Sequence, residues 1–342
     1  MVNQLVKGGH PVSLTATHAG DATDITWAWT KPADSTAPAS TSNVLSWTAA
    51  ATDGGEYKAT ATSATAYDSP LQDAVELVVC DPDAYNLIRA MEAADGQPLE
   101  YEVQMALHNL ATKIKSHPGL WESIYLLHPL SAARTATGGY LPLKNPDFYQ
   151  TLNVTQVDYS RTLGFKCSAG TYYYLSVFWV ELDQTAGKLQ FSILLTSPPV
   201  VTSGSVLLMQ HYQNPSRKTE LSLNLDLSST LAAIQTDNAA SLYGPEMSLD
   251  MPAFYYAGRS DDDTVHYIAG DSTPRVLEPA TRGTNSDWTN GYGVTMYGQG
   301  NPENGQTAML CCYGNLAPGY EDGTVLEQIF REYHTELLAA LA

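Results

Sequence analysis

The chain has 342 residues with 36 acidic and 17 basic side chains, which gives a formal net charge of −19. This acidity, without a basic stripe, argues against binding to nucleic acid or to phosphate groups. Charged residues make up only 15% of the chain, and 21 tyrosines outnumber 6 phenylalanines, an aromatic usage typical of binding surfaces rather than of compact catalysts. The length predicts two domains, or one large domain with a small partner.

The N-terminal segment, MVNQLVKGGHPVSL, lacks the apolar core of a secretion signal. The densest apolar run, residues 172–180, has the length of a strand rather than of a membrane span. The four cysteines, which have no zinc-site spacing, are Cys80, Cys167, Cys311 and Cys312. We interpret them as buried thiols of a protein that folds in a reducing compartment, and we expect no membrane insertion.

Residues 1–80 alternate apolar and polar side chains with frequent turns, which predicts a small β-sandwich. Two predicted strands each place three apolar side chains on one face, namely Val12, Leu14 and Ala16 on the first and Ile25, Trp27 and Trp29 on the second. Further strands are expected over Val44–Thr48, 57–61 and 74–79.

The motif Asp53-Gly54-Gly55-Glu56-Tyr57 has the form D-x-G-x-Y and precedes a predicted strand. In immunoglobulin-like domains such a tyrosine bonds back to the backbone a few residues upstream and forms the tyrosine corner. With the segments VSLTATHAGDATDITWAW and LSW, it makes residues 1–80 resemble the B, C, E and F strands of an immunoglobulin-like domain. The resemblance implies Trp27 or Trp29 as the core tryptophan. It also places Ala16 and Ala59 at the family's disulfide positions, so that packing replaces the bridge.

Residues 81–134 are predicted to be a helical linker segment. Apolar side chains at helical spacing form one stripe, which consists of Leu99, Val103, Ala106, Leu107, Leu110 and Ile114. Pro98 suits the first turn of this helix and Pro118-Gly119 its end, and a shorter helix is expected over 84–94. The stripe fits either a helix that binds a partner or, by base rates, a helix packed on its own neighbouring sheet.

Residues 135–342 are predicted to form a jelly-roll sandwich that ends in a helix over about 324–341. Turn signals separate candidate strands at 172–180, 189–195, 205–211, 220–227, 253–257, 265–268, 292–297 and 307–313. The predicted fold class is therefore mainly β, with an immunoglobulin-like sandwich, a short helical segment and a concanavalin-like jelly roll with a C-terminal helix.

A series of weak motifs makes the chain beyond residue 98 resemble the concanavalin-like (laminin-G-like) proteins of tailed-bacteriophage virions. In order, these are a helix ending in Leu120-Trp121-Glu122-Ser123-Ile124-Tyr125, then LKNP at 143–146, GFK at 164–166, HYIAG at 266–270, GVTMYG at 293–298 and GNL at 314–316. The resemblance implies a structural virion protein on the capsid or tail, as a decoration, fibre or receptor-binding component. Such a protein folds in the host cytoplasm, is released by lysis and assembles with other virion proteins, as a homo-oligomer by analogy, with host-surface glycan as the expected ligand.

We predict that the chain is not an enzyme and has no catalytic residues. Glu181 and Asp183 lie on one face in an E-x-D spacing, as glycosidase carboxylates do, but no third acid follows them on that face. No metalloprotease, P-loop, dinucleotide or serine-elbow motif is present. The alternative functions are a carbohydrate-active enzyme and a bacterial surface adhesin with a lectin-like domain.

Aromatic residues near glycines and asparagines are the candidate ligand-binding residues, because aromatic faces stack on sugar rings. They are Trp288, Tyr292, Tyr297 and Tyr243. The alternative is that these rings fill the core or a subunit interface. Asp261, Asp262 and Asp263 are the candidate metal site, where carboxylate oxygens would hold Ca²⁺, and the alternative there is an exposed acidic turn. No other cofactor is expected.

Overall fold

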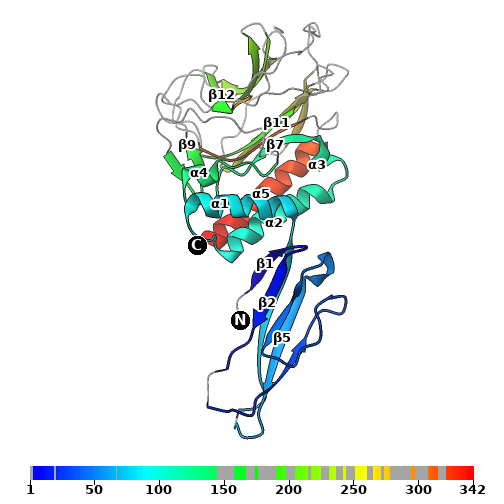
Figure 1. Cartoon of the computed structure of the whole chain (residues 1–342). Helices are drawn as coiled ribbons and strands as arrows, with labels where there is room; N and C mark the ends of the chain where they lie inside the picture. Colours follow the sequence, from blue (N-terminus) through cyan, green and yellow to red (C-terminus); the bar gives the residue numbers. More distant parts are fainter. Residues whose placement is uncertain are drawn as a thin grey trace. The chain divides into compact units, whose positions relative to one another are not determined.

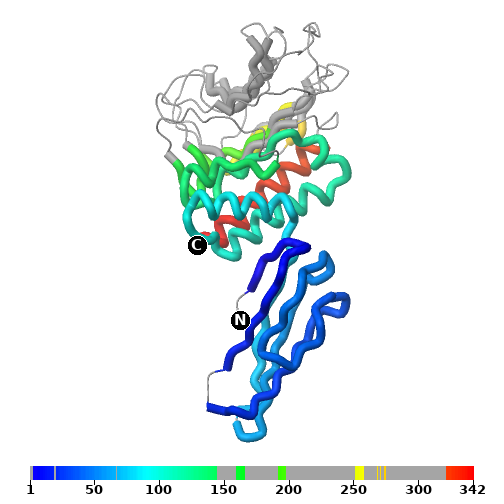
Figure 2. The backbone as a smooth tube through the Cα atoms, viewed as in Figure 1, coloured from blue at the N-terminus to red at the C-terminus, as the bar shows by residue number. Residues whose placement is uncertain are grey.

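The computed structural model describes residues 3–18, 21–66, 68–144, 158–166, 174–175, 190–197, 205–214, 217–224, 231–235, 242–243, 251–259, 265–270, 273–277, 294–296, 307–314 and 321–342 (Figure 2). The chain divides into two compact units, Met1–Ile88 with Leu99–His108 and Arg89–Pro98 with Asn109–Ala342. The predicted fold class is confirmed, because the structure is mainly β with a few helices, one of them C-terminal (Figure 1). The domain boundaries after residues 80 and 134 remain predictions.

The first unit contains two sheets. One has the strand order β1 (Gln4–Lys7), β6 (Leu71–Cys80), β5 (Gly55–Thr62) and β3 (Thr26–Thr30), and the other pairs β2 (Pro11–Thr15) with β4 (Val44–Thr48). Strand β1 runs parallel to β6, and the remaining pairs are antiparallel. Strands β2 and β4 occupy the B and E places of an immunoglobulin-like sandwich, and β3, β5 and β6 the C, F and G places.

The core of this sandwich comes from the inward faces of both sheets. Its buried members include Val12, Leu14, Leu45, Tyr57, Val75 and Leu77. Trp29 packs against this cluster, so of the two predicted tryptophans it is the one in the core, together with the half-buried Trp47. Ala16 and Ala59 are 3% and 2% exposed, as expected for an apolar pair at the disulfide positions. Cys80 is a buried thiol.

The predicted tyrosine corner is present. The Tyr57 hydroxyl lies 3.0 Å from the Asp53 carbonyl oxygen, to which it donates. The Asp53 side chain, fully buried, accepts four hydrogen bonds at 2.5–2.8 Å, from the backbone N–H groups of Thr36 and Ala50, the Thr36 hydroxyl and the Trp47 indole. Burial alone would raise the pKa of this carboxyl, but the hydrogen bonds from Ala50, Trp47 and Thr36 outweigh burial and hold the pKa well below its usual value.

Both predicted linker helices form, as α1 (Pro82–Asp95) and α2 (Tyr101–Ser116). The predicted apolar stripe of α2 is buried at every position, so it packs within the protein rather than standing free for a partner. The expected helix through Tyr125 is wrong. The chain forms only the short α3 (Leu120–Ser123) and then enters strand β7 (Ile124–His128), because β7 pairs with a strand far along the chain.

The second unit contains two antiparallel sheets, whose strands β11 and β12 lie in different layers in Figure 1. The larger has the order β18 (Pro274–Leu277), β17 (Val265–Ala269), β16 (Ala253–Arg259), β11 (Gln190–Ser197), β20 (Thr307–Gly314), β9 (Gly164–Lys166) and β8 (Asp158–Ser160), and β7 also pairs with β20. The smaller has the order β10 (Tyr174–Leu175), β19 (Val294–Met296), β12 (Ser205–Asn214), β13 (Arg217–Asn224), β14 (Leu231–Gln235) and β15 (Leu242–Tyr243). Strands appear at every predicted position from 189–195 to 307–313. Residues 189, 225–227, 292–293 and 297 of those ranges, like most of 172–180, lie outside the described residues.

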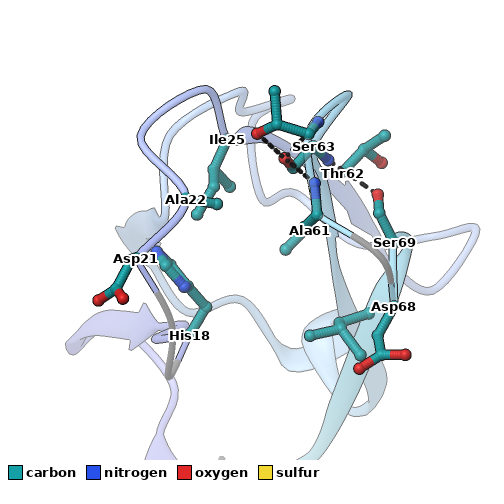
Figure 3. Close-up of a pocket in the computed structure, with 12 residues that line it drawn as sticks. His18, Asp21, Ala22, Ile25, Ala61, Thr62, Ser63, Asp68 and Ser69 are labelled. Carbon is teal, nitrogen blue, oxygen red and sulfur yellow. Dashed lines mark hydrogen bonds between the residues drawn. The ribbon is translucent and has the colours of Figure 1, made fainter.

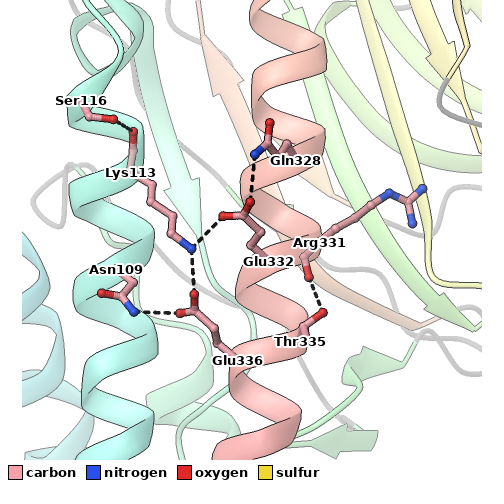
Figure 4. Close-up of polar contacts among 8 residues, drawn as sticks. All are labelled: Asn109, Lys113, Ser116, Gln328, Arg331, Glu332, Thr335 and Glu336. Atoms are coloured by element: carbon pink, nitrogen blue, oxygen red, sulfur yellow. Dashed lines mark hydrogen bonds and ion pairs between the residues drawn. The ribbon is translucent and has the colours of Figure 1, made fainter.

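Helix α5 (Glu321–Leu341) packs on the larger sheet through β16. Phe330 meets Phe254 edge to face, with ring centroids 5.7 Å apart. Gly323 lies so close to Tyr256 that a Cβ on the glycine would come 2.7 Å from the tyrosine ring. On its polar side, α5 holds Lys113 of α2 through Glu332 and Glu336, each 2.7 Å from the ammonium (Figure 4). The small α4 (Ala136–Gly139) completes the helices of the described segments, and no described helix meets the length and apolarity needed to cross a membrane.

Candidate functional site

A pocket of about 430 Å³ opens at one end of the immunoglobulin-like unit (Figure 3). It lies between the β2–β3 loop, residues 16–25, and the β5–β6 loop, residues 63–70. These are the B–C and F–G loops of the fold, which in antibody variable domains belong to the ligand-binding end. The volume falls within the range of about 300–1,000 Å³ usual for small-molecule sites.

The floor of the pocket exists because the two sheets differ in strand length. Strands β5 and β6 have eight and ten residues, whereas β2 and β4 have five each. The inward face of β5 runs through Tyr57 and Ala59, which are buried, to Ala61, which is only half-buried. Leu71, directly opposite Ala61 in the β5–β6 register, is 52% exposed. On β5 the apolar core face therefore continues past the end of the smaller sheet, whereas on β6 Asp73 interrupts it before Leu71. Ala61 and Leu71 form the open floor beyond that point.

Asp24, in the first loop, connects the two walls of the pocket through hydrogen bonds to the second loop. Its carboxylate accepts hydrogen bonds from the Ser63 hydroxyl at 2.6 Å, the Thr65 hydroxyl at 2.8 Å and the Ala64 N–H at 2.8 Å. These bonds, that from Ser63 foremost, lower the pKa of Asp24 from 3.8 to about 2. The Ser69 hydroxyl accepts from the Ser63 N–H at 2.8 Å within the same loop. The walls are thus pre-organised by hydrogen bonds at neutral pH, which reduces the entropy lost when a ligand binds.

The rim carries the polar groups that a ligand would meet. His18 and Asp21 come from the first loop and Asp68 from the second. Within the described segments, these three side chains make no hydrogen bond or ion pair. An imidazole and two carboxylates over a floor of Ala61 and Leu71 suit a ligand with hydroxyl or amino groups at its edge and an apolar face.

No residue of this pocket was identified from the sequence alone. Because the predicted strands were of nearly equal length, the available signal was Ser, Thr, Ala and Asp enrichment in two turns some forty residues apart. This signal does not indicate that the turns meet, because their proximity depends on the pairing of β3 with β5.

The ligand and metal residues predicted from the sequence are not tested by the structure. Trp288, Tyr292, Tyr297, Asp261, Asp262 and Asp263 lie outside the described residues, as do Glu181 and Asp183. Tyr243 lies in β15 opposite Ala233, but its side chain is outside the description. Among the described residues, no group of three or more His, Cys, Asp or Glu side chains is gathered that could hold a metal ion.

A buried histidine marks the interior of the second unit. His128 of β7 is fully buried, and its Nδ1 lies 2.9 Å from the Tyr140 carbonyl oxygen. Burial lowers the pKa of His128 to about 3, and the Tyr140 carbonyl only partly opposes this, so the ring is neutral at pH 7. Because a neutral ring holds one proton, Nδ1 donates to Tyr140, and Nε2 has no partner in the part of the chain that is described.

Comparisons with known proteins assign no family, since neither a family model nor a curated protein matches the chain. Solved structures similar to it include a sialidase of Trypanosoma rangeli, with 10% sequence identity and a TM-score of 0.44, over 81% of this chain and 43% of the sialidase. Another is the binding domain of botulinum neurotoxin serotype D, with 9% identity and a TM-score of 0.44, over 64% of this chain and 53% of that chain. This chain therefore spans less than half of the sialidase.

The prediction that the chain is not an enzyme is wrong, because the grounds given for it do not exclude catalysis. Sialidases are enzymes, and they stand among the solved structures that this chain resembles. The prediction depended on the missing third acid after Glu181 and Asp183 and on the absence of metalloprotease, P-loop, dinucleotide and serine-elbow motifs, and such motifs represent only some kinds of enzyme. Carboxylates from separate strands can form a catalytic pair without any fixed spacing in the sequence.

Proposed function

We propose that the chain is a surface protein that binds carbohydrate, and that the loop-end pocket of its immunoglobulin-like unit is a recognition site. The observation that carries the proposal is the combination of an uncovered apolar floor with a polar rim that makes no hydrogen bond within the described residues, in a pocket whose walls are already hydrogen-bonded. An exposed leucine at the bottom of a hollow is unfavourable in water, and a ligand that covers Leu71 removes that cost.

A saccharide matches this chemistry. A sugar ring has hydroxyl groups around its edge and C–H groups on its face, so the edge can donate to Asp21 and Asp68 while the face rests on Ala61 and Leu71. The carboxylates on the rim and the net charge of −19 disfavour acidic sugars. Neutral or amino sugars are therefore the expected ligands of this pocket.

The test is binding of the full chain to an array of neutral, amino and acidic glycans. Asp68→Asn and Leu71→Ala should each weaken binding by roughly five- to thirtyfold, as expected for one charged hydrogen bond or one apolar contact. Asp34→Asn is the matched control, because Asp34 is an exposed acid that follows the far end of β3. Equal binding by Asp68→Asn, Leu71→Ala and the unmodified chain would remove the pocket from the proposal.

The same array reports on catalysis. If the chain turns over a bound glycan, released sugar accumulates with time, and Glu181→Gln or Asp183→Asn should abolish the release. Binding without release favours an adhesin, and release favours the carbohydrate-active enzyme. Either result keeps the carbohydrate ligand.

We further propose display on the virion of a tailed phage, on its capsid or tail and among other virion proteins. Support comes from the sequence resemblance of residues 98–342 and from Ala16 and Ala59, which let the immunoglobulin-like unit fold in a reducing cytoplasm without a bridge. A bacterial surface adhesin with the same modules is the alternative. Immunogold labelling of intact particles should mark the capsid or tail, and unlabelled particles would contradict this placement.

A second carbohydrate surface is proposed in the larger unit at Trp288, Tyr292, Tyr297 and Tyr243, with Ca²⁺ at Asp261, Asp262 and Asp263. Trp288→Ala should reduce any binding that survives Leu71→Ala. Chelation should reduce the same residual binding if the acidic cluster holds Ca²⁺, and unchanged binding in excess chelator would remove the metal from the proposal.

A further inference from the structure

Strand β3 forms an open edge of the larger sheet in the immunoglobulin-like unit. In the order β1, β6, β5, β3 it has β5 as its neighbour on one side and, among the described strands, none on the other. No other backbone hydrogen bond reaches residues 26–30 from the described part of the chain. One row of N–H and C=O groups on this strand therefore faces outward, which is the template on which a further strand can add.

This edge lacks the features that usually protect an exposed strand. Proteins block such edges with charged side chains, prolines or bulges. The sequence of β3 is Thr-Trp-Ala-Trp-Thr, without charge or proline, and its register with β5 runs without a bulge from Thr26–Thr62 to Thr30–Lys58. By contrast, the opposite edge strand β1 ends in Lys7, and β2 in the other sheet begins with Pro11.

The strand is also a palindrome. If two copies pair in antiparallel fashion about Ala28, Thr26 of one lies opposite Thr30 of the other, and Trp27 lies opposite Trp29. Each residue then meets a partner of the same type or its own equivalent, which is the self-complementarity that a twofold interface requires. Trp27 and Trp29 are half-buried and share one face, so the pairing covers the rest of both rings with aromatic neighbours.

We propose that the β3 edge is a self-association surface and that its occupant is β3 of a second copy, paired antiparallel with Ala28 at the twofold axis. The two four-stranded sheets then become one continuous sheet. The paired segment is uncharged, so the acidic chains, each with a net charge of −19, do not place like charges opposite one another at the contact. This inference does not depend on the carbohydrate ligand.

The test uses sedimentation velocity on the full chain across a concentration series. The unmodified chain should associate into dimers, and more strongly at higher salt, because salt screens the repulsion between the acidic copies. Ala28→Lys and Ala28→Glu should each weaken self-association at least tenfold, since each places two like charges directly opposite. An equimolar mixture of the two variants should recover it, since only this register sets the introduced ammonium of one copy against the introduced carboxylate of the other across the axis.

Thr60→Lys is the matched control. Thr60 is paired with Ala28 on β5, on the same outer face of the sheet, but one strand in from the edge. It should leave association unchanged, and recovery in the mixture shows that the Ala28 variants are folded. A chain that stays monomeric at every concentration, an Ala28→Lys variant that associates as before, or a mixture that does not recover would each overturn the proposal.

Discussion

The Asp53 carboxylate offers the sharpest test of how the immunoglobulin-like unit is held together. Replacing Asp53 by alanine removes the acceptor of four hydrogen bonds in a fully buried place. The backbone N–H groups of Thr36 and Ala50 and the Trp47 indole then lose their acceptor, at a cost of about 1–3 kcal/mol for a fully buried donor and less for these part-buried ones. Partial access of water to the new space lowers the sum, so we expect Asp53→Ala to reduce the free energy of unfolding by about 3–5 kcal/mol.

Asp53→Asn should cause a smaller loss of stability than Asp53→Ala. The amide keeps one oxygen acceptor and presents an NH₂ group to the remaining donors, so about half the loss is expected, roughly 2 kcal/mol. Asp34→Ala, an exposed acid of the same unit, is the control and should change stability by less than about 0.5 kcal/mol. Urea titration followed by tryptophan fluorescence reports the change, which for Asp53→Ala should lower the urea midpoint by at least about 1 M.

The pH dependence tests the same reasoning. Because the pKa of Asp53 is lower in the folded chain than in the unfolded chain, its stabilisation is complete above the usual carboxyl pKa and is lost as pH falls toward the folded value. The difference between the unmodified chain and Asp53→Asn should stay constant from pH 7 to about pH 4 and shrink below that. A loss under about 1 kcal/mol for Asp53→Ala, or a difference that does not change in acid, would refute the hydrogen-bond account.

Three further predictions concern the second unit, each measured by thermal or urea unfolding. Gly323→Ala should destabilise it by about 1–3 kcal/mol, because the new Cβ meets the Tyr256 ring at 2.7 Å, and no loss would mean that the helix shifts freely on the sheet. In the unmodified chain, the free energy of unfolding should fall below pH 6.5 by up to about 1.4 kcal/mol per pH unit, because the unfolded histidine binds a proton that the folded one, with a pKa of about 3, does not. His128→Gln should flatten this fall. A slope that persists in the variant would assign it to other groups. Lys113→Met should lower the free energy of unfolding by less than about 1 kcal/mol, and by less still in high salt, because the ion pair with Glu336 is partly solvated. A larger loss, or one that does not depend on salt, would contradict this.

Features of the fold that depend on near neighbours in the sequence were predictable. Alternation of side chains predicted strands β2 to β6 of the first unit, though not β1, and the buried pattern of β2 follows it residue by residue. The spacing from Asp53 to Tyr57 predicted the corner hydrogen bond, because donor and acceptor lie four residues apart on one turn. Helical periodicity predicted the buried stripe of α2 for the same reason.

Features that depend on distant segments were not predictable. Ile124 and Tyr125 continue a helical pattern, but pairing with β20, nearly two hundred residues later, makes them part of a strand. The short strands β8, β9, β15 and β18 carry too few residues for a period to be recognised, and they form by pairing with neighbouring strands.

Residue pattern and composition were enough to predict the fold class, an immunoglobulin-like topology with alanines in place of its cysteines, and, from the acidic balance, the expectation of no nucleic-acid partner. The position of the proposed ligand pocket in that unit became visible only in the folded chain. The pocket needs strands of unequal length and two loops joined through Asp24, and the partners of the Asp53 carboxylate come from separate turns. The physical reason is that periodicity reflects contacts within one segment, whereas a site forms where segments converge, and convergence is set by the pairing of whole strands.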